Sequence, residues 1–297
     1  MKTIYPKDLS TVDLQNLLQG AVAPRPIAFV STIDRAGNVN LSPFSFFNLF
    51  SANPPILIFS PSRRVRDNTT KHTLDNVVEV PEAVIHIVGF DRVEQMSLAS
   101  TEYPKGVNEF EKAGLTAIPS SLVTPPRVNE SAVAFECKVI EVKSLGTEGG
   151  AGNLVICEVI AMHVDEAILD EKGTIDPQKL SPVARLGGSW YSRITSDSLF
   201  QIPKPLTNLG IGVDQIPDDI RQSPILTGNN LGRLGNVMEL PSAVELEDFS
   251  NSEEILEMRI RFKNDKDSWL DHLHLKAKEV LENGDVAIAW KYLLQKP

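Results

Sequence analysis

The chain has 297 residues, of which 42% are hydrophobic and 23% are charged, with 29 Lys and Arg against 39 Asp and Glu. This length favours two structural units, and the composition excludes a disordered chain, a collagen-like repeat and a small disulfide scaffold. The net charge of −10 argues against nucleic-acid binding, which requires a basic surface.

No apolar stretch approaches the roughly 18 residues of a membrane helix, and the first residues lack the apolar core of a signal peptide. We therefore expect a cytoplasmic protein with no membrane partner. Cys137 and Cys157 lie in apolar, strand-like runs. This placement favours buried free thiols over a redox pair.

Residues 1–195 predict a mainly β domain with helical insertions. Short β-rich runs alternate with turn residues, which is typical of an antiparallel sheet or barrel. The expected strands are 26–33, 39–45, 56–60, 83–88, 132–142 and 154–164. The expected helices are 11–19 with Gly20 as its C-cap, 69–77, 91–100, and 107–113 before Gly114.

Residues 196–297 predict a C-terminal extension of different texture. Residues 196–235 are rich in Pro, Gly, Asn and Asp, including the run Ile202–Pro205, and we expect an irregular connector that lies on the core domain. Residues 250–297 are expected to be mostly helical, with a capping box at 251–254, a helix over 266–282 and a further one at 287–290.

The segment Ser42-Pro43-Phe44-Ser45 and the residues up to Asn48 form the first candidate site. Because Pro43 cannot donate a ladder hydrogen bond, we expect the strand to bend or leave the sheet there. Backbone N–H groups and two hydroxyls would then lie beside three aromatic rings, a combination that suits a planar, heteroatom-rich ligand. The alternative is a hydrophobic corner of the core.

A basic cluster follows. Arg63, Arg64 and Lys71 lie with several Ser and Thr hydroxyls between a predicted strand end and a predicted helix start. Cations beside a helix N-terminus are typical of an anion site, and a phosphate fits best. The alternative is a solvated basic face.

Taken together and in chain order, these segments resemble the flavin reductase-like family of split-barrel FMN-binding proteins. The resemblance covers about residues 15–195 and depends on the ordered set of motifs. The matching segments are 25–32 with Asp34, Gly37 and Asn38, then 42–48, Phe59-Ser60 with Arg63 and Arg64, Lys71-x-Thr73-x-x-Asn76, 106–116 and 184–191. His72, where members usually have Asp, and the extension after Thr195 depart from the family pattern.

The resemblance implies a six-stranded antiparallel Greek-key split barrel that forms a homodimer and holds one FMN per subunit near the interface. It implies that the isoalloxazine and ribityl chain contact Ser42, Pro43, Phe44, Ser45 and Asn48. It implies that the phosphate is held by Ser60, Arg63 or Arg64, Lys71, Thr73 and Asn76.

The resemblance also implies an oxidoreductase in which NAD(P)H transfers a hydride to flavin N5 and the electrons pass to free flavin or another small acceptor. A flavin supplies the redox chemistry, so no acid–base pair is needed. The sequence contains no Gly-x-Ser-x-Gly, Cys-x-x-Cys, His-Glu-x-x-His or Gly-x-Gly-x-x-Gly motif after a strand. NAD(P)H is therefore expected to dock transiently, without a domain of its own.

His163, at the end of the strand 154–164, is either structural or a catalytic residue that flanks the flavin face. The other histidines show no metal-ligand spacing, so we expect no metal. Two other functions remain open: an FMN-carrying electron-transfer protein without nicotinamide turnover, and a flavin-free split-barrel interaction module.

Overall fold

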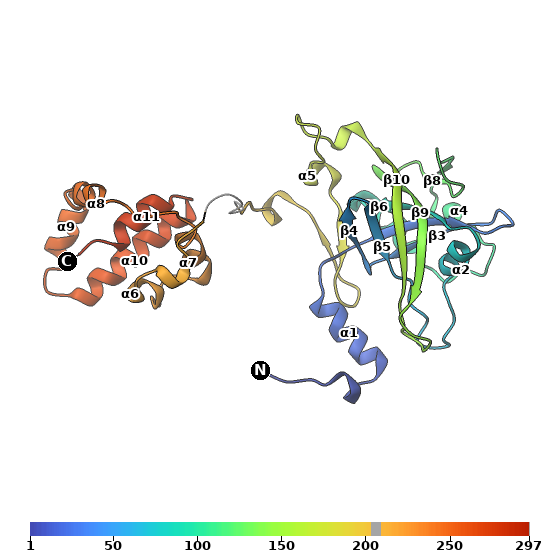
Figure 1. Cartoon of the computed structure of the whole chain (residues 1–297), viewed down its shortest axis with the longest axis horizontal. Coiled ribbons are helices and arrows are strands. Elements are labelled where there is room, and N and C mark those ends of the chain that lie inside the picture. Colours follow the sequence, from blue (N-terminus) through green and yellow to red (C-terminus); the bar gives the residue numbers. More distant parts are fainter. Residues whose placement is uncertain (203–208, 297) are drawn as a thin grey trace. The chain divides into compact units, whose positions relative to one another are not determined.

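The computed structural model describes residues 1–202 and 209–296, so Pro203 to Pro205 of the expected connector lie outside the described residues. The chain divides into two compact units, Met1–Phe200 and Gln201–Pro297 (Figure 1). None of the helices in the described ranges combines the length and the apolar character that crossing a membrane requires.

Unit 1 is built on an antiparallel sheet of seven strands in the order β3-β2-β6-β9-β10-β5-β4. This result confirms the expectation of a mainly β unit with helical insertions. The strands are β2 (Ala28–Ile33), β3 (Val39–Phe44), β4 (Phe47–Ala52), β5 (Pro55–Phe59), β6 (Glu82–Ile87), β9 (Val133–Ser144) and β10 (Asn153–Val164).

Alternation along β2 places side chains in two separate cores, because successive strand residues point to opposite faces. Ala28 and Val30 pack inside the curved sheet, with Phe44, Phe59 and Cys157 among their neighbours. Phe29 faces outward into a second buried cluster, which the helices α3 (Val93–Leu98) and α4 (Glu109–Ala113) cover.

The seventh strand arises because the chain does not leave the sheet at Pro43. Instead, Pro43 pairs with Phe29 inside β3, which is an edge strand and can therefore accommodate a missing donor. Only Ser45 and Phe46 separate β3 from β4, the two outermost strands of the sheet, so the sheet's two edges meet there. The stacked rings of Phe44 and Phe59, 5.3 Å apart, fill the inside of this junction.

The remaining elements of unit 1 are short or peripheral. The strands are β1 (Arg25–Pro26), β7 (Ala117–Ile118), β8 (Arg127–Val128), β11 (Val183–Arg185) and β12 (Tyr191–Arg193). The helices are α1 (Thr11–Ala21), α2 (His72–Glu79), α5 (Pro177–Leu180) and the 3-10 turns η1 (Pro6–Asp8), η2 (Phe90–Arg92), η3 (Glu166–Ile168) and η4 (Ser196–Ser198).

Two expected helix boundaries in unit 1 were wrong. Gly20 lies inside the last turn of α1 and is not its C-cap. The buried guanidinium of Arg25 donates to the carbonyls of Gln19 and Val22, so a distant side chain satisfies the end of α1. The helix expected from Thr69 begins only at His72, and residues 69–71 form part of the preceding loop.

Unit 2 is helical around its own buried core, in which Trp269, Leu273 and Trp290 are almost inaccessible to solvent. Its elements are η5 (Val213–Gln215), α6 (Asp218–Arg221), α7 (Gly228–Leu234), α8 (Ala243–Ser250), α9 (Glu253–Arg261), α10 (Lys266–Glu282) and α11 (Val286–Leu293).

The expected irregular connector differs from the structure in its second half. Ile216, Ile220 and Leu234 are buried in the core of unit 2, two of them within the short helices α6 and α7. The expected capping box at 251–254 is also absent from α9, whose N-cap Ser252 accepts no capping hydrogen bond. A capping box forms instead one helix earlier, between Ser242 and Glu245 of α8.

Cys137 and Cys157 are buried free thiols on the neighbouring strands β9 and β10, as expected. Burial and the neighbouring thiol raise the pKa of Cys137. Both cysteines therefore act as small apolar core residues.

His86, on β6, is the fully buried titratable group at the centre of unit 1. Its Nδ1 lies 2.9 Å from the Phe29 carbonyl, and its Nε2 accepts the Val128 N–H at 3.0 Å. An accepting Nε2 requires a neutral ring with the proton on Nδ1. Burial lowers the pKa of His86 from 6.5 to about 4.

We expect His86 to make unit 1 less stable in mild acid. Between pH 6.5 and 4 the unfolded chain binds a proton here that the folded chain does not, so the free energy of unfolding falls as pH falls. The loss amounts to about 3 kcal/mol at most. Urea unfolding at pH 8, 6 and 4.5, followed by circular dichroism, should show a shallower pH dependence in His86→Gln than in the wild type. Comparison with pH 8 separates lost contacts from titration, and equal slopes would refute the assignment.

Candidate functional site

Four of the predicted site residues surround one small cavity beside the start of α2. Ser42 reaches it from β3, and Arg64, Lys71 and Thr73 reach it from the loop and helix that follow β5. The cavity has a volume of about 20 Å³, which is room for about one water molecule. Its other walls include Asn40, His72, Glu102 and Glu109.

The guanidinium of Arg64 is held from several directions. Its Nη1 donates to Thr69 Oγ1 at 2.8 Å and to the Thr70 carbonyl, and its Nε donates to Glu102 Oε1 at 3.0 Å. The side chain is only 15% exposed. Arg64 is therefore a fixed cation at the edge of the cavity.

Two further cations converge on the same carboxylate, Glu102. Lys71 Nζ lies 3.5 Å from Glu102 Oε1, and Arg66 pairs with Glu102 Oε2. Hydrogen bonds from Arg64 and Arg66, opposed in part by desolvation, lower the pKa of Glu102. Three cations thus share one anion, which leaves a locally basic cluster on an acidic chain. We call Arg64, Arg66 and Lys71 the cation cluster.

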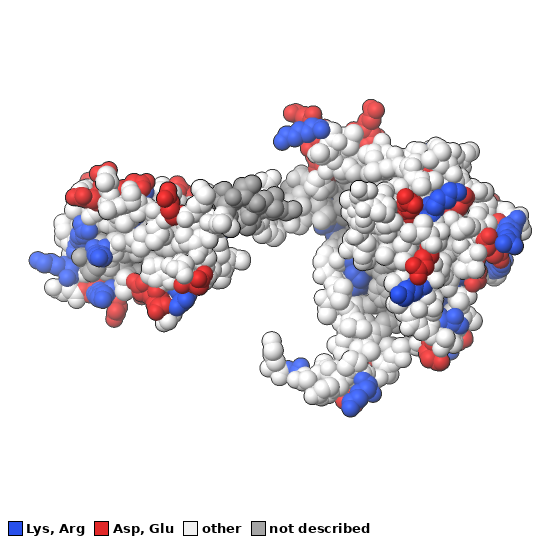
Figure 2. Space-filling model, viewed as in Figure 1, with Lys and Arg blue, Asp and Glu red and all other residues white. Residues whose placement is uncertain are grey.

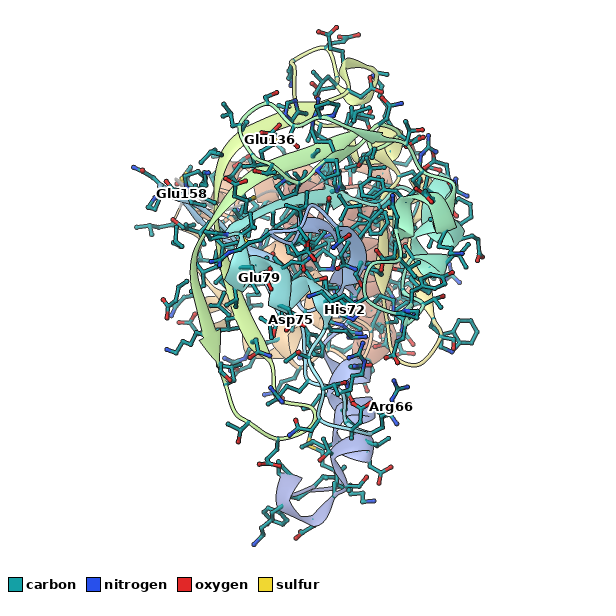
Figure 3. All side chains as sticks on the ribbon, turned by 90° about the vertical axis from the view of Figure 1, so that its right-hand side faces the viewer. Arg66, His72, Asp75, Glu79, Glu136 and Glu158 are labelled. Carbon is teal, nitrogen blue, oxygen red and sulfur yellow. The ribbon has the colours of Figure 1, made fainter. Side chains whose placement is uncertain are left out.

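The start of α2 adds backbone donors to this region. Its N-cap residue Lys71 makes no side-chain capping bond, so the first N–H groups of the helix are left to other acceptors within the described part of the chain. Figure 3 shows His72 and Asp75 at this end of α2, with Arg66 in the adjacent loop. A helix start beside cations is suited to bind an anion.

A buried polar network forms the floor of the cavity. Thr73 Oγ1 donates to Asn40 Oδ1 at 2.6 Å, and Asn40 Nδ2 donates to Glu109 Oε1 at 2.9 Å. Glu109 also accepts the Leu41 N–H at 3.1 Å, and burial raises its pKa. This network ties α4 to β3 and α2, and so positions Thr73.

Three residues expected at the phosphate lie away from the cavity. Arg63 donates through Nε and Nη2 to the side chain and carbonyl of Asn68, at 2.6 Å each, and so closes the loop on itself. Asn76 is buried and donates to Thr32 Oγ1 at 3.1 Å. Ser60 is buried beside the β4 junction, where its N–H donates to the Phe46 carbonyl.

The residues expected at the flavin ring are split between core and surface. Phe44 points inward against Phe59, and Pro43 is paired within β3. Ser45 is half-buried in the β3–β4 junction, and Asn48 is exposed on β4, where its Oδ1 accepts the Leu49 N–H at 2.8 Å. Ser42, Ser45 and Asn48 thus remain accessible, whereas the Phe44 ring is used by the core.

His163 does not join this cluster. Its Nε2 lies 2.7 Å from Glu136 Oε1, and Glu136 also accepts the N–H groups of Ser121 and Leu122. Figure 3 shows Glu136 well separated from His72 and Arg66. The structure thus places His163 with a buried carboxylate that holds the 121–122 loop against β9.

A second cavity of about 340 Å³ lies on the outer side of β2 and β6. Phe29, Met96 and Val128 form part of its apolar wall, and Arg193, stacked 3.9 Å from the Phe90 ring centroid, forms part of its rim. None of the predicted site residues lines it. In the described ranges, no group of three or more His, Cys, Asp or Glu side chains is arranged to hold a metal ion.

Sequence reasoning missed the acidic and amide residues of the site. Glu109 stands inside a quoted motif, but its role depends on contact with β3, which is 68 residues away in the chain. Glu102 lies in a polar loop with no local signal, because its partners are 31 to 38 residues earlier. Asn40, a polar residue in an otherwise apolar strand, was the one detectable sign.

Comparisons with known proteins agree with this geometry. The family described as "Flavin reductase like domain" matches residues 21–180. An uncharacterized protein of Aquifex aeolicus is 41% identical over 178 residues, which are 60% of this chain and 88% of that protein.

Two solved structures share the fold of unit 1. Nitrilotriacetate monooxygenase component B from Bacillus cereus is 32% identical with a TM-score of 0.64, over 68% of this chain and 98% of that one. A split-barrel protein of Shewanella frigidimarina assigned as a flavin reductase is 28% identical with a TM-score of 0.58, over 68% and 100% of the two chains.

These likenesses confirm the split-barrel fold that the sequence predicted. The matched region lies within unit 1 and includes every residue of the small cavity. The chain belongs to the flavin reductase-like family.

Proposed function

We propose that the protein is an FMN-binding oxidoreductase that takes electrons from NAD(P)H and passes them to free flavin or another small acceptor. The observation that carries the proposal is the cation cluster beside the uncapped start of α2, at a cavity also lined by Ser42 of the β3 segment. Family membership supports a flavin as the ligand.

The residues present fit the phosphate of FMN. Arg64 is fixed, Lys71 is about one-third exposed, and both lie beside the first N–H groups of α2. Charged donors and a helix start provide the strong, charge-assisted hydrogen bonds that a phosphate requires. We assign the phosphate to Arg64, Lys71 and the backbone of Thr73, with Arg63, Ser60 and Asn76 supporting the surrounding loops.

The ring system would lie along the accessible β3–β4 segment, where Ser42, Ser45 and Asn48 offer polar groups. Bound FMN would supply the hydride-accepting chemistry. The chain's part is then to bind the phosphate, orient the ring and leave one ring face open to the nicotinamide. The pairing of His163 with Glu136 argues for a structural role, so we propose no catalytic side chain there.

A homodimer is part of the proposal, because β4 is an edge strand that is exposed on both faces. Leu49 and Phe50 are 61% and 63% exposed, although neighbouring strand residues point in opposite directions. Leu17, Leu18 and Val22 of the α1 region are also exposed, and Figure 2 shows few charged side chains on the α1 surface in view. Exposed apolar edges of this kind mark association surfaces.

Loss of the two fixed cations should release FMN. We expect Arg64→Ala combined with Lys71→Ala to weaken FMN binding about 10- to 100-fold, since each charge-assisted hydrogen bond contributes about 1.5–3 kcal/mol. Quenching of flavin fluorescence measures the Kd. Riboflavin, which lacks the phosphate, should bind both proteins alike, and the charge-matched control Arg35→Ala with Lys138→Ala should retain FMN. Unchanged FMN affinity in the first double variant would refute the phosphate assignment.

Nicotinamide reduction separates the proposed reductase from an electron-transfer protein. We expect NADH or NADPH, mixed anaerobically with the FMN-loaded protein, to bleach the flavin absorbance, because an open ring face allows direct hydride transfer. Dithionite is the control for a reducible flavin. Bleaching by dithionite but by neither nicotinamide would favour the electron-transfer alternative, and a protein that binds no flavin would favour the interaction module.

The exposed strand β4 predicts the subunit contact. Leu49→Asp with Phe50→Asp should weaken a homodimer at least about 100-fold, because two large apolar side chains contribute about 1.5–3 kcal/mol each when buried. Sedimentation velocity at micromolar concentrations measures the effect. Leu122→Asp, at another exposed leucine, is the control. A wild-type protein that sediments as a monomer would contradict the homodimer.

A further inference from the structure

Glu102 occupies the position in the cation cluster where an anionic ligand would make its contacts. Its Oε1 lies 3.0 Å from Arg64 Nε and 3.5 Å from Lys71 Nζ, and its Oε2 pairs with Arg66. Cations brought together on a fold repel one another unless an anion lies between them. Glu102 is thus the internal counter-ion of the cation cluster.

The cavity is too small for Glu102 and a phosphate group together. Its volume of about 20 Å³ admits about one water molecule, and Glu102 forms one of its walls beside Arg64 and Lys71. A phosphate group, with four oxygens around phosphorus, is several times larger than a water molecule. A phosphate can therefore contact Arg64 and Lys71 at this cavity only when the Glu102 side chain moves.

Glu102 is the member of the cluster that is free to move. It stands in the loop between α3 and α4, and its side chain is 35% exposed. Arg64 stays in place without it, because Thr69 and the Thr70 carbonyl also hold the guanidinium. Rotation of Glu102 into solvent would leave the cations positioned for a new anion.

We propose that Glu102 is exchanged for the FMN phosphate, so that this carboxylate sets both the affinity for FMN and the preference for phosphorylated flavin. The inference rests on the proposed function, because it takes the FMN phosphate as the incoming anion. In the exchange, the carboxylate's hydrogen bonds to Arg64, Arg66 and Lys71 are replaced by those of the phosphate. FMN binding therefore measures the difference between two anions on one cluster.

Three variants test the exchange. Glu102→Gln keeps the size of the side chain and removes its charge, so FMN should bind about three- to tenfold more tightly, the range expected when an exposed ion pair no longer competes. Riboflavin affinity should remain unchanged, since riboflavin brings no anion. Glu82→Gln, which removes a glutamate paired with Lys138, is the matched control and should leave both affinities unchanged.

Binding in the Arg64→Ala, Lys71→Ala background completes the test. There the gain from Glu102→Gln should disappear, because the exchange acts through these cations. In the wild-type background, unchanged or weaker FMN binding by Glu102→Gln, with the cation variants still impaired, would overturn the exchange and leave the phosphate site standing. If wild type and Glu102→Gln both fail to bind FMN, the exchange and the proposed function are overturned together.

Discussion

The site depends on keeping several cations close together at the end of β5. Coulomb repulsion opposes this arrangement, and the loop that carries the cluster resists it through contacts within itself. Arg63 clamps Asn68, and Arg64 is bonded to Thr69 and Thr70. The barrel anchors both ends of this loop, because β5 is paired on both edges and α2 packs against β2 and β3.

The parts of the fold that sequence reasoning predicted are those with a local cause. Apolar alternation marked β2, β6, β9 and β10, and the anion site was visible because its basic residues lie within nine positions of one another. Arg63 and Arg64 could not be separated in this way, since adjacent residues share every local signal. Which one enters the cavity depends on the turn that Asn68 makes, with φ at 57°.

The parts that were missed have causes far away in the chain. Pro43 suggested an exit from the sheet, but the cost of a missing donor depends on whether the strand lies at an edge, and local sequence does not show that. The second half of the connector was expected to be irregular because its helices have only four and seven residues. Ile216, Ile220 and Leu234 are ordered by burial against the long helices of unit 2, and propensity alone would not predict their helices.

The role of Glu102 connects stability with binding. A cluster of cations that awaits a phosphate would destabilise the flavin-free chain, whereas a carboxylate in its midst stabilises it. The same carboxylate then opposes the ligand, so stability without FMN and affinity for FMN cannot both be maximal at this loop. A protein that hands reduced flavin to other acceptors gains from moderate affinity, since release is then fast. The internal counter-ion therefore agrees better with a flavin that exchanges than with one held permanently.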